Sequence, residues 1–208
     1  MRSLSGLTVG FIVVLSALSF CPGCRETPPR SGMQMAQIRD HEAQKKERDV
    51  IVIETDLGDI VILPATPAKK TIRKIKELVD QGFYNGLTFH YVEQGSMIQG
   101  GDMNTRDDDP TNDGAGDPGF ILEAEEGAPN MMGGVGLAHP PGEPNAGNSQ
   151  FYILLKDRPE LNGRYTVFGF VVEGLDVVNK ISRVQSDENG RPLENVRMKQ
   201  VYVEKRFV

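Results

Sequence analysis

The chain has 208 residues, of which 38% are hydrophobic and 25% charged, a composition typical of a soluble domain with its own core. Its 23 Lys and Arg residues face 29 Asp and Glu residues, for a formal net charge of −6. This acidic balance argues against nucleic-acid binding, because phosphate contacts require a basic face. The 23 Gly and 13 Pro residues, with no Trp, favour a loop-rich β protein over a helical bundle.

Residues 1–24 have the layout of an export signal. Arg2 precedes an apolar run from Leu7 to Phe20, and this run is shorter than the roughly 20 residues that a membrane-spanning helix needs. The run ends at Cys21 and Cys24. This arrangement resembles the bacterial lipoprotein signal, in which a cysteine after small residues is lipidated and becomes the new N-terminus.

Cys24 is the favoured lipidation site because it follows the small Gly23, whereas Cys21 follows the bulky Phe20. Cys21 remains the alternative, and so do a plain signal peptide and an uncleaved anchor. A redox CxxC motif would require a preceding strand and a following helix, and the sequence supplies neither. We therefore expect an exported protein of the cell envelope or periplasm, held on a membrane by its N-terminal lipid.

Residues 25–49 are polar and contain Pro28-Pro29, so we interpret them as a tether, with helical character from Met35 to Arg48. From Val50 onward the sequence has the runs of apolar residues that are typical of a folded domain, which we assign to residues 50–208.

Runs of β-branched and alternating residues predict strands in this domain. They cover 50–55, 58–63, 87–92, 97–99, 120–122, 150–155, 166–171 and 198–207. Amphipathic spacing predicts helices over 71–79 and 174–184, and Gly-rich composition predicts loops over 100–119 and 133–150. The count of strands and helices fits a mostly β fold, a closed eight-stranded antiparallel barrel with two helices.

Four strings in the domain resemble the cyclophilin family of peptidyl-prolyl cis–trans isomerases. They are Gly82–His90, Met97–Asp102, Ser149–Ile153 and Leu161–Gly169, and the resemblance covers about residues 50–206. It implies an eight-stranded antiparallel barrel capped by two helices, in agreement with the pattern of strands. It also implies that proline-containing polypeptide segments are the substrate.

The chemistry that the resemblance implies needs no metal, nucleotide or other cofactor. Rotation about an X–Pro amide has a barrier of roughly 18–20 kcal/mol and takes tens to hundreds of seconds without catalysis. A site lowers this barrier by binding the twisted amide better than either planar form. A hydrogen-bond donor, an apolar pocket for the proline ring and polar groups for the flanking backbone suffice.

The resemblance assigns a role to individual residues. Tyr91 occupies the position of the family's catalytic arginine, and Gln99 is the retained glutamine beside it. The implied substrate-binding residues are Ser96, Met97, Ala138, His139, Gln150, Tyr152, Leu161 and Tyr165. Ser96 replaces a pocket phenylalanine, Glu160 replaces a tryptophan, and the segment from His139 to Ser149 is about two residues longer than usual. His90 fits a buried structural residue better than a proton carrier.

These departures predict a weak or altered isomerase. Tyr91 offers a neutral hydroxyl, and a hydrogen bond to a charged group is worth roughly 1.5–3 kcal/mol against about 0.5–1.5 for a neutral one. The alternative is a non-catalytic module that binds proline peptides as a chaperone or scaffold, and a third hypothesis is a structural envelope protein without a peptide groove. We expect a monomer.

Two further motifs suggest other ligands, and neither fits. The acidic run Asp107–Asp109 with Asp113 lacks the spacing and flanking helices of a calcium-binding EF-hand. Gly133, Gly134 and Gly136 lack the Lys-Ser/Thr of a phosphate loop and are interpreted as tight backbone beside the groove.

Overall fold

The structure, a computed structural model, describes residues 46–64, 67–107 and 109–208. The predicted signal segment 1–24, including Cys21 and Cys24, lies outside these residues, as does the predicted tether up to residue 45. Within the described ranges, no helix combines the length and the apolar character needed to cross a membrane.

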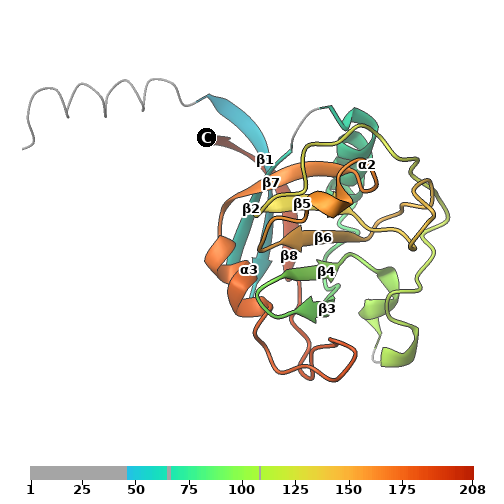
Figure 1. The fold of residues 1–208 in the computed structure, drawn as a ribbon. Coiled ribbons are helices and arrows are strands. Elements are labelled where there is room, and N and C mark those ends of the chain that lie inside the picture. Colours follow the sequence, from blue (N-terminus) through green and yellow to red (C-terminus); the bar gives the residue numbers. More distant parts are fainter. Residues whose placement is uncertain (1–45, 65–66, 108) are drawn as a thin grey trace, which may run out of the picture. The chain divides into compact units, whose positions relative to one another are not determined.

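Eight strands form one antiparallel sheet in the order β3-β4-β6-β5-β7-β2-β1-β8 (Figure 1). They are β1 Glu47–Thr55, β2 Gly58–Pro64, β3 Phe89–Glu93, β4 Met97–Gly100, β5 Gly134–Leu137, β6 Phe151–Leu154, β7 Val167–Glu173 and β8 Gln200–Phe207. Asp56 and Leu57 form the turn between β1 and β2, which pairs Thr55 with Gly58. The mostly β class and the antiparallel pairing are confirmed.

The long first strand is apolar on both faces. Ile51 and Ile53 face the main core, whereas Val50 and Val52 pack on the opposite side with Val61. Because successive side chains of a strand point to opposite faces, a continuous apolar run is buried only where both faces are covered. β1 begins at Glu47, inside the predicted tether, so the helix expected to reach Arg48 is wrong at its C-terminal end.

The prediction of a closed barrel is not confirmed, because the described sheet has two end strands, β3 and β8, with no ladder between them. The segments that precede these strands do meet. The backbone N–H of Met198 donates to Leu87 O over 2.8 Å, and that of Phe89 donates to Val196 O over 3.0 Å. A single bridge, between Thr88 and Arg197, joins the two ends.

Two strand assignments differ from the predictions. Residues 120–122 form no strand and contribute one bridge, between Leu122 and Gly147. β5 instead occupies Gly134–Leu137, where a loop was expected, and pairs with β6 and β7. Glycine weakens a strand on its own, so the local sequence signal is poor. All four residues of β5 are buried, and its pairing with β6 and β7 outweighs the poor strand propensity of its glycines.

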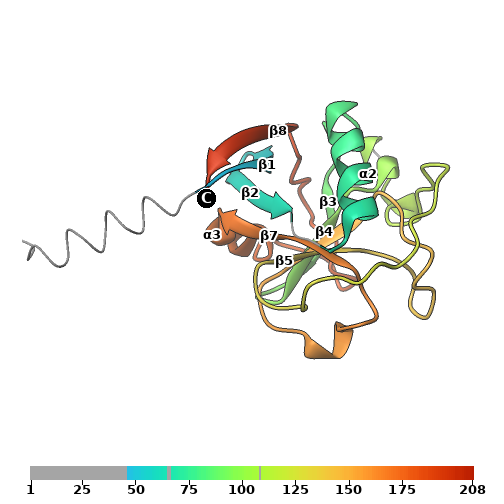
Figure 2. The same cartoon turned by 90° about the horizontal axis from the view of Figure 1, so that it is seen from above.

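Both predicted helices are present and lie well apart on the outside of the sheet (Figure 2). α2 spans Lys69–Asp80 and contacts β7 and β8, while α3 spans Leu175–Ile181 and contacts β2. α2 buries Ile75, Leu78 and Val79, which recur on one face at helical spacing.

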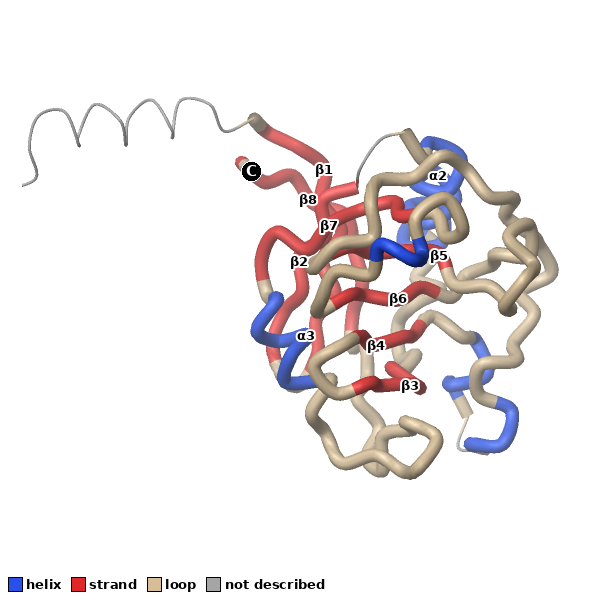
Figure 3. Tube along the Cα trace, in the orientation of Figure 1, coloured by secondary structure: helices blue, strands red, loops and turns tan. Residues whose placement is uncertain are grey.

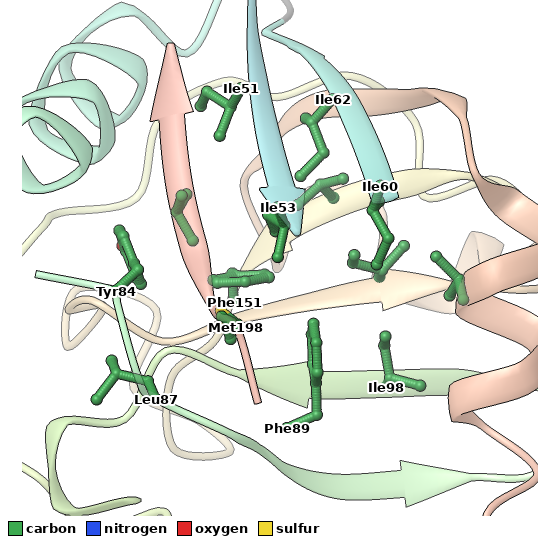
Figure 4. Packing of buried hydrophobic residues seen from close by; sticks show 14 of the residues in the cluster. Ile51, Ile53, Ile60, Ile62, Tyr84, Leu87, Phe89, Ile98, Phe151 and Met198 are labelled. Carbon is green, nitrogen blue, oxygen red and sulfur yellow. The ribbon is translucent and has the colours of Figure 1, made fainter. Parts of the chain in front are cut away.

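The main core fills the space enclosed by the curved sheet (Figure 4). Side chains from widely separated strands point toward one another there, among them Ile53 of β1, Ile60 of β2, Phe89 of β3 and Ile98 of β4. Each of these four side chains is at most 2% exposed. Truncation of one such side chain to Ala costs about 2–5 kcal/mol, so the core fixes the strands on which the site is built.

The N-terminus of α2 is capped from a distant loop. Ala68 at the cap position has no side-chain acceptor. The Glu125 carboxylate takes its place: it accepts from the backbone N–H of Lys70 over 3.0 Å and from that of Thr71 over 2.6 Å. Desolvation alone would raise the pKa of Glu125, but the hydrogen bonds from Lys70 and Thr71 outweigh it and the pKa is lowered.

Glu125→Ala is expected to lower the free energy of unfolding by about 1–2 kcal/mol, because it leaves two N–H groups of the first helical turn without their acceptor. Chemical denaturation at neutral pH measures the change. Glu126→Ala is the matched control, since Glu126 is exposed and adjacent. Equal stability of the two variants would show that the cap contributes nothing.

Candidate functional site

A groove of about 730 Å³ lies on the outer side of β4 and β6, beside the long loops that follow β4 and β5. Figure 3 shows these loops gathered at one end of the central strands. The groove is lined by strand residues, by the loop around Gly114–Asp117, and by Arg158 and Leu161, which precede and end the 3₁₀ helix η3, Pro159–Leu161. Of the predicted site residues, it brings together Met97, Gln99, Ala138, His139, Gln150, Tyr152, Leu161 and Tyr165.

The strand register explains how alternate residues reach this groove. Ile98 is fully buried in the core, so its neighbours Met97 and Gln99 point to the opposite face. Across the sheet, Gln99 pairs with Tyr152 of β6, and Tyr152 pairs with Gly136 of β5. Directly paired residues share a face, so these positions form one row on the groove side.

The apolar wall depends on Tyr152, which is only 3% exposed. A Cβ atom at Gly136 would lie 2.1 Å from its ring, so only glycine admits the ring this close to β5. The Tyr152 hydroxyl donates to Asn130 Oδ1 over 2.5 Å. Burial raises the pKa of Tyr152, and Tyr165 raises it further, so the phenol stays neutral. Met97, Ala138, Leu154 and Tyr165 pack around it as one cluster.

His139 and Tyr165 form the adjoining aromatic wall. Their rings stack with centroids 4.1 Å apart and an angle of 11° between the planes. One ring nitrogen of His139 lies 2.8 Å from Pro140 O and the other lies 3.0 Å from Arg164 O. The ring therefore ties the loop after β5 to the segment before β7.

The polar side of the groove is a short relay of amides. Gln99 Nε2 donates to Gln150 Oε1 over 3.1 Å, and Gln150 Nε2 donates to Gly114 O over 3.0 Å. The fully buried Asp102 holds the same loop in place by accepting from the backbone N–H groups of Gly114 and Gly116. Two side-chain amides are thereby held in fixed orientations beside the apolar wall.

Tyr91 and Ser96 do not line the groove, although both are close to residues that do. Tyr91 is paired with Gln99 across β3 and β4, and its ring packs against Gly190. Ser96 is 1% exposed, and its hydroxyl accepts a hydrogen bond from Arg158. Tyr91 thus lies beside the groove, and its catalytic role stays a prediction.

The sequence reading missed Arg158, Asn130 and the pair Phe120 and Ile121. Arg158, Phe120 and Ile121 line the groove, and Asn130 holds the Tyr152 hydroxyl. Asn130 also accepts from the backbone N–H of Arg158 over 2.9 Å. No local motif marks these positions, because the contacts that bring them to the site join residues far apart in the chain.

Residues 50–203 match the family model described as "Cyclophilin type peptidyl-prolyl cis-trans isomerase/CLD". The chain belongs to this family. The predicted enzyme class, a cyclophilin-type peptidyl-prolyl cis–trans isomerase, is confirmed.

Individual relatives agree with this assignment. A protein of Brucella suis biovar 1 named "Probable peptidyl-prolyl cis-trans isomerase" is 39% identical over 166 residues, which are 76% of this chain and 83% of the relative. The mouse protein "Peptidyl-prolyl cis-trans isomerase-like 1" is 34% identical over 157 residues, which are 73% of this chain and 90% of the relative.

Solved structures show the same fold. The crystal structure of a cyclophilin type peptidyl-prolyl cis-trans isomerase of Cryptosporidium parvum, determined in the presence of the dipeptide Ala-Pro, superimposes with a TM-score of 0.67. It is 25% identical to this cyclophilin-type chain and covers 76% of it, and 99% of the solved chain is matched.

His90 of this cyclophilin-type domain lies beneath the groove loop, and Nδ1 of its ring is buried without a hydrogen-bond partner among the described residues. A Cβ atom at Gly114 would lie 3.8 Å from the ring. Desolvation lowers the pKa of His90, nearby Asp102 opposes this shift and Arg191 adds to it. The lowered pKa means that the folded state favours the neutral imidazole.

His90 should therefore make stability depend on pH. As pH falls through about 6.5, His90 is protonated in the unfolded chain before it is protonated in the folded chain. The free energy of unfolding is therefore unaffected by His90 above that pH and decreases below it. The slope cannot exceed about 1.4 kcal/mol per pH unit for one proton. Denaturant unfolding from pH 7.5 to 5.0 should show a flatter profile for His90→Gln than for the native chain. His41→Gln, outside the domain, is the control; identical profiles for all three would contradict the assignment.

Proposed function

We propose that this protein catalyses cis–trans isomerisation of proline-containing segments of proteins in the bacterial cell envelope, with weakened or altered activity. The observation that carries the proposal is the groove itself. The apolar cluster of Met97, Tyr152 and Tyr165 adjoins the oriented amides of Gln99 and Gln150 in one cavity. An apolar pocket next to fixed hydrogen-bonding groups is what a bound X–Pro segment requires.

The proposed mechanism is non-covalent. The cluster around Tyr152, together with Leu161, grips the proline ring and excludes water from one side of the amide. Gln99 and Gln150 hold the flanking backbone, so that rotation about the C–N bond occurs against a fixed frame. Preorganised dipoles that fit the twisted amide better than the planar forms lower the barrier without proton or electron transfer.

The proposed weakness rests on Tyr91. A phenol at the position of an arginine supplies no charge, and the ring lies beside the groove against Gly190. The same observation favours the second candidate function, a non-catalytic module that binds proline peptides as a chaperone or scaffold. Binding and turnover measured on one peptide separate the two.

Tyr91→Arg is expected to raise kcat/KM for an Ala-Pro peptide by roughly 5- to 50-fold, because a charged donor replaces a neutral one. Two-dimensional NMR exchange at high enzyme concentration measures both the rate and the affinity. Tyr91→Phe is the control that removes the hydroxyl alone. Peptide binding by the native chain without faster exchange would favour the binding module, and neither binding nor exchange would overturn both functions.

We further propose that Cys24 carries a lipid that anchors the protein to a membrane of the envelope. Cys24→Ser should move the protein from the detergent phase to the aqueous phase in a phase-partition assay of cells that express the full chain, because a diacyl modification adds many buried methylenes. Cys21→Ser is the matched control. Loss of partitioning in Cys21→Ser instead would assign the lipid to Cys21, and no change in either variant would overturn the anchor.

A further inference from the structure

Arg158 is the only Lys or Arg that lines the groove in the part of the chain that the structure describes. It immediately precedes η3 and lies in the groove wall together with Met97, Leu161 and Glu93. Its side chain is 24% exposed. A guanidinium therefore lines the groove beside apolar side chains and amides, with the carboxylate of Glu93 next to it.

The guanidinium is held rigidly from one side. Nη2 donates to Glu93 Oε2 over 2.6 Å and to Ser96 Oγ over 2.5 Å. The backbone N–H of Arg158 donates to the carbonyl of the buried Asn130. These contacts join three separate segments, and they fix the fork of donors before any peptide arrives, so little side-chain entropy is lost on binding.

The remaining donors of the guanidinium are not committed in the same way. Both hydrogens of Nη2 are used by Glu93 and Ser96. Nη1 donates no hydrogen bond to a described residue, and its ion-pair partner Glu160 lies 3.5 Å away with a side chain that is 57% exposed. Nε is buried with no acceptor among the described residues. The side chain is thus held at the groove while its own hydrogen-bonding capacity is left incomplete.

The small residue at position 96 makes this arrangement possible. Ser96 is buried beside β4, and its hydroxyl accepts a hydrogen bond from the Arg158 guanidinium. An aromatic side chain at this position would offer no such acceptor and would need the volume next to Arg158. Ser96 and Arg158 therefore operate as a pair, with Ser96 positioning the guanidinium.

We propose that Arg158 is a substrate-contacting residue, whose Nη1 donates to an oxygen of the bound peptide next to the proline. The proposal rests on the proposed binding of proline peptides in this groove. The oxygen belongs either to a backbone carbonyl or to the carboxylate of a flanking Asp or Glu, since both accept from a guanidinium. Nη2 stays on Glu93 and Ser96, so the contact forms without breaking the existing pair.

The test compares Arg158→Met with the native chain on three peptides, Ac-Ala-Ala-Pro-Ala-amide and its versions with Glu or Gln after the proline. NMR titration gives Kd, and exchange spectroscopy gives kcat/KM. Loss of a hydrogen bond to a charged group should weaken binding about tenfold. An equal loss on all three peptides assigns the contact to a backbone carbonyl. A loss confined to the Glu peptide assigns it to a carboxylate.

Lys156→Met is the matched control. Lys156 lies 3.8 Å from the same Glu93 carboxylate but does not line the groove. It should leave all three affinities within about twofold of the native values, because exposed ion pairs contribute little. If Arg158→Met also stays within that range, or only matches Lys156→Met, the proposal for Arg158 is overturned.

A second variant keeps the test decisive. Arg158→Gln retains an amide that can donate to Ser96, and it replaces Arg158→Met if that variant fails to fold. The weakening of peptide binding expected for Arg158→Gln is the same as for Arg158→Met. If the native chain itself binds none of the peptides, the proposed function fails together with this proposal. If the native chain binds the peptides and the Arg158 variants bind them with the same affinity, the proposal for Arg158 fails while the proposed function stands.

Discussion

The contact between the Tyr152 ring and the bare backbone of Gly136 is the constraint on which the groove depends. It lets β5 and β6 keep their antiparallel pairing while a large aromatic side chain packs on their outer face. The Tyr152 hydroxyl then donates to the side-chain oxygen of Asn130, and the backbone carbonyl of Asn130 accepts from the backbone N–H of Arg158. The absence of a Cβ atom at Gly136 thereby affects both the apolar pocket and the backbone of Arg158, because the two hydrogen bonds that link them both end on the buried Asn130.

The two sides of the groove are fixed by different physics. The apolar side is held by packing, with His139 stacked on Tyr165 and the Tyr165 ring edge-on to that of Tyr152. The polar side is held by directional hydrogen bonds that run from Gln99 through Gln150 to the Gly114 carbonyl. Packing defines where a proline ring fits, whereas oriented amides define how its backbone lies. A rotation about one bond needs both, because the ring must stay still while the carbonyl turns.

Local sequence patterns predicted those parts of the fold that obey a local rule. The strand predicted over 97–99 is β4, and the helix predicted over 71–79 lies within α2. β5 escaped prediction because its glycines answer to close contacts rather than to strand propensity: Gly136 lies against the ring of Tyr152 across the sheet, and Gly134 lies against the carbonyl of Met131. The resemblance located most of the groove but transferred positions, not orientations. It could not show that the ring of Tyr91 packs against Gly190, nor that Arg158 lies next to Ser96, which is 62 positions away in sequence.

Arg158 and Tyr91 together change how charge is distributed at this site. On β3, Tyr91 presents a phenol beside the groove, whereas the cation that lines the groove, Arg158, immediately precedes η3 and is paired with Glu93. A paired guanidinium has a smaller net field than a free one, but it keeps its donors and its planar geometry. It therefore suits recognition of a fixed oxygen better than stabilisation of a charge that develops during rotation. The groove keeps an apolar pocket beside fixed amides, and the cation among its described lining residues is the paired Arg158 rather than a residue of β3.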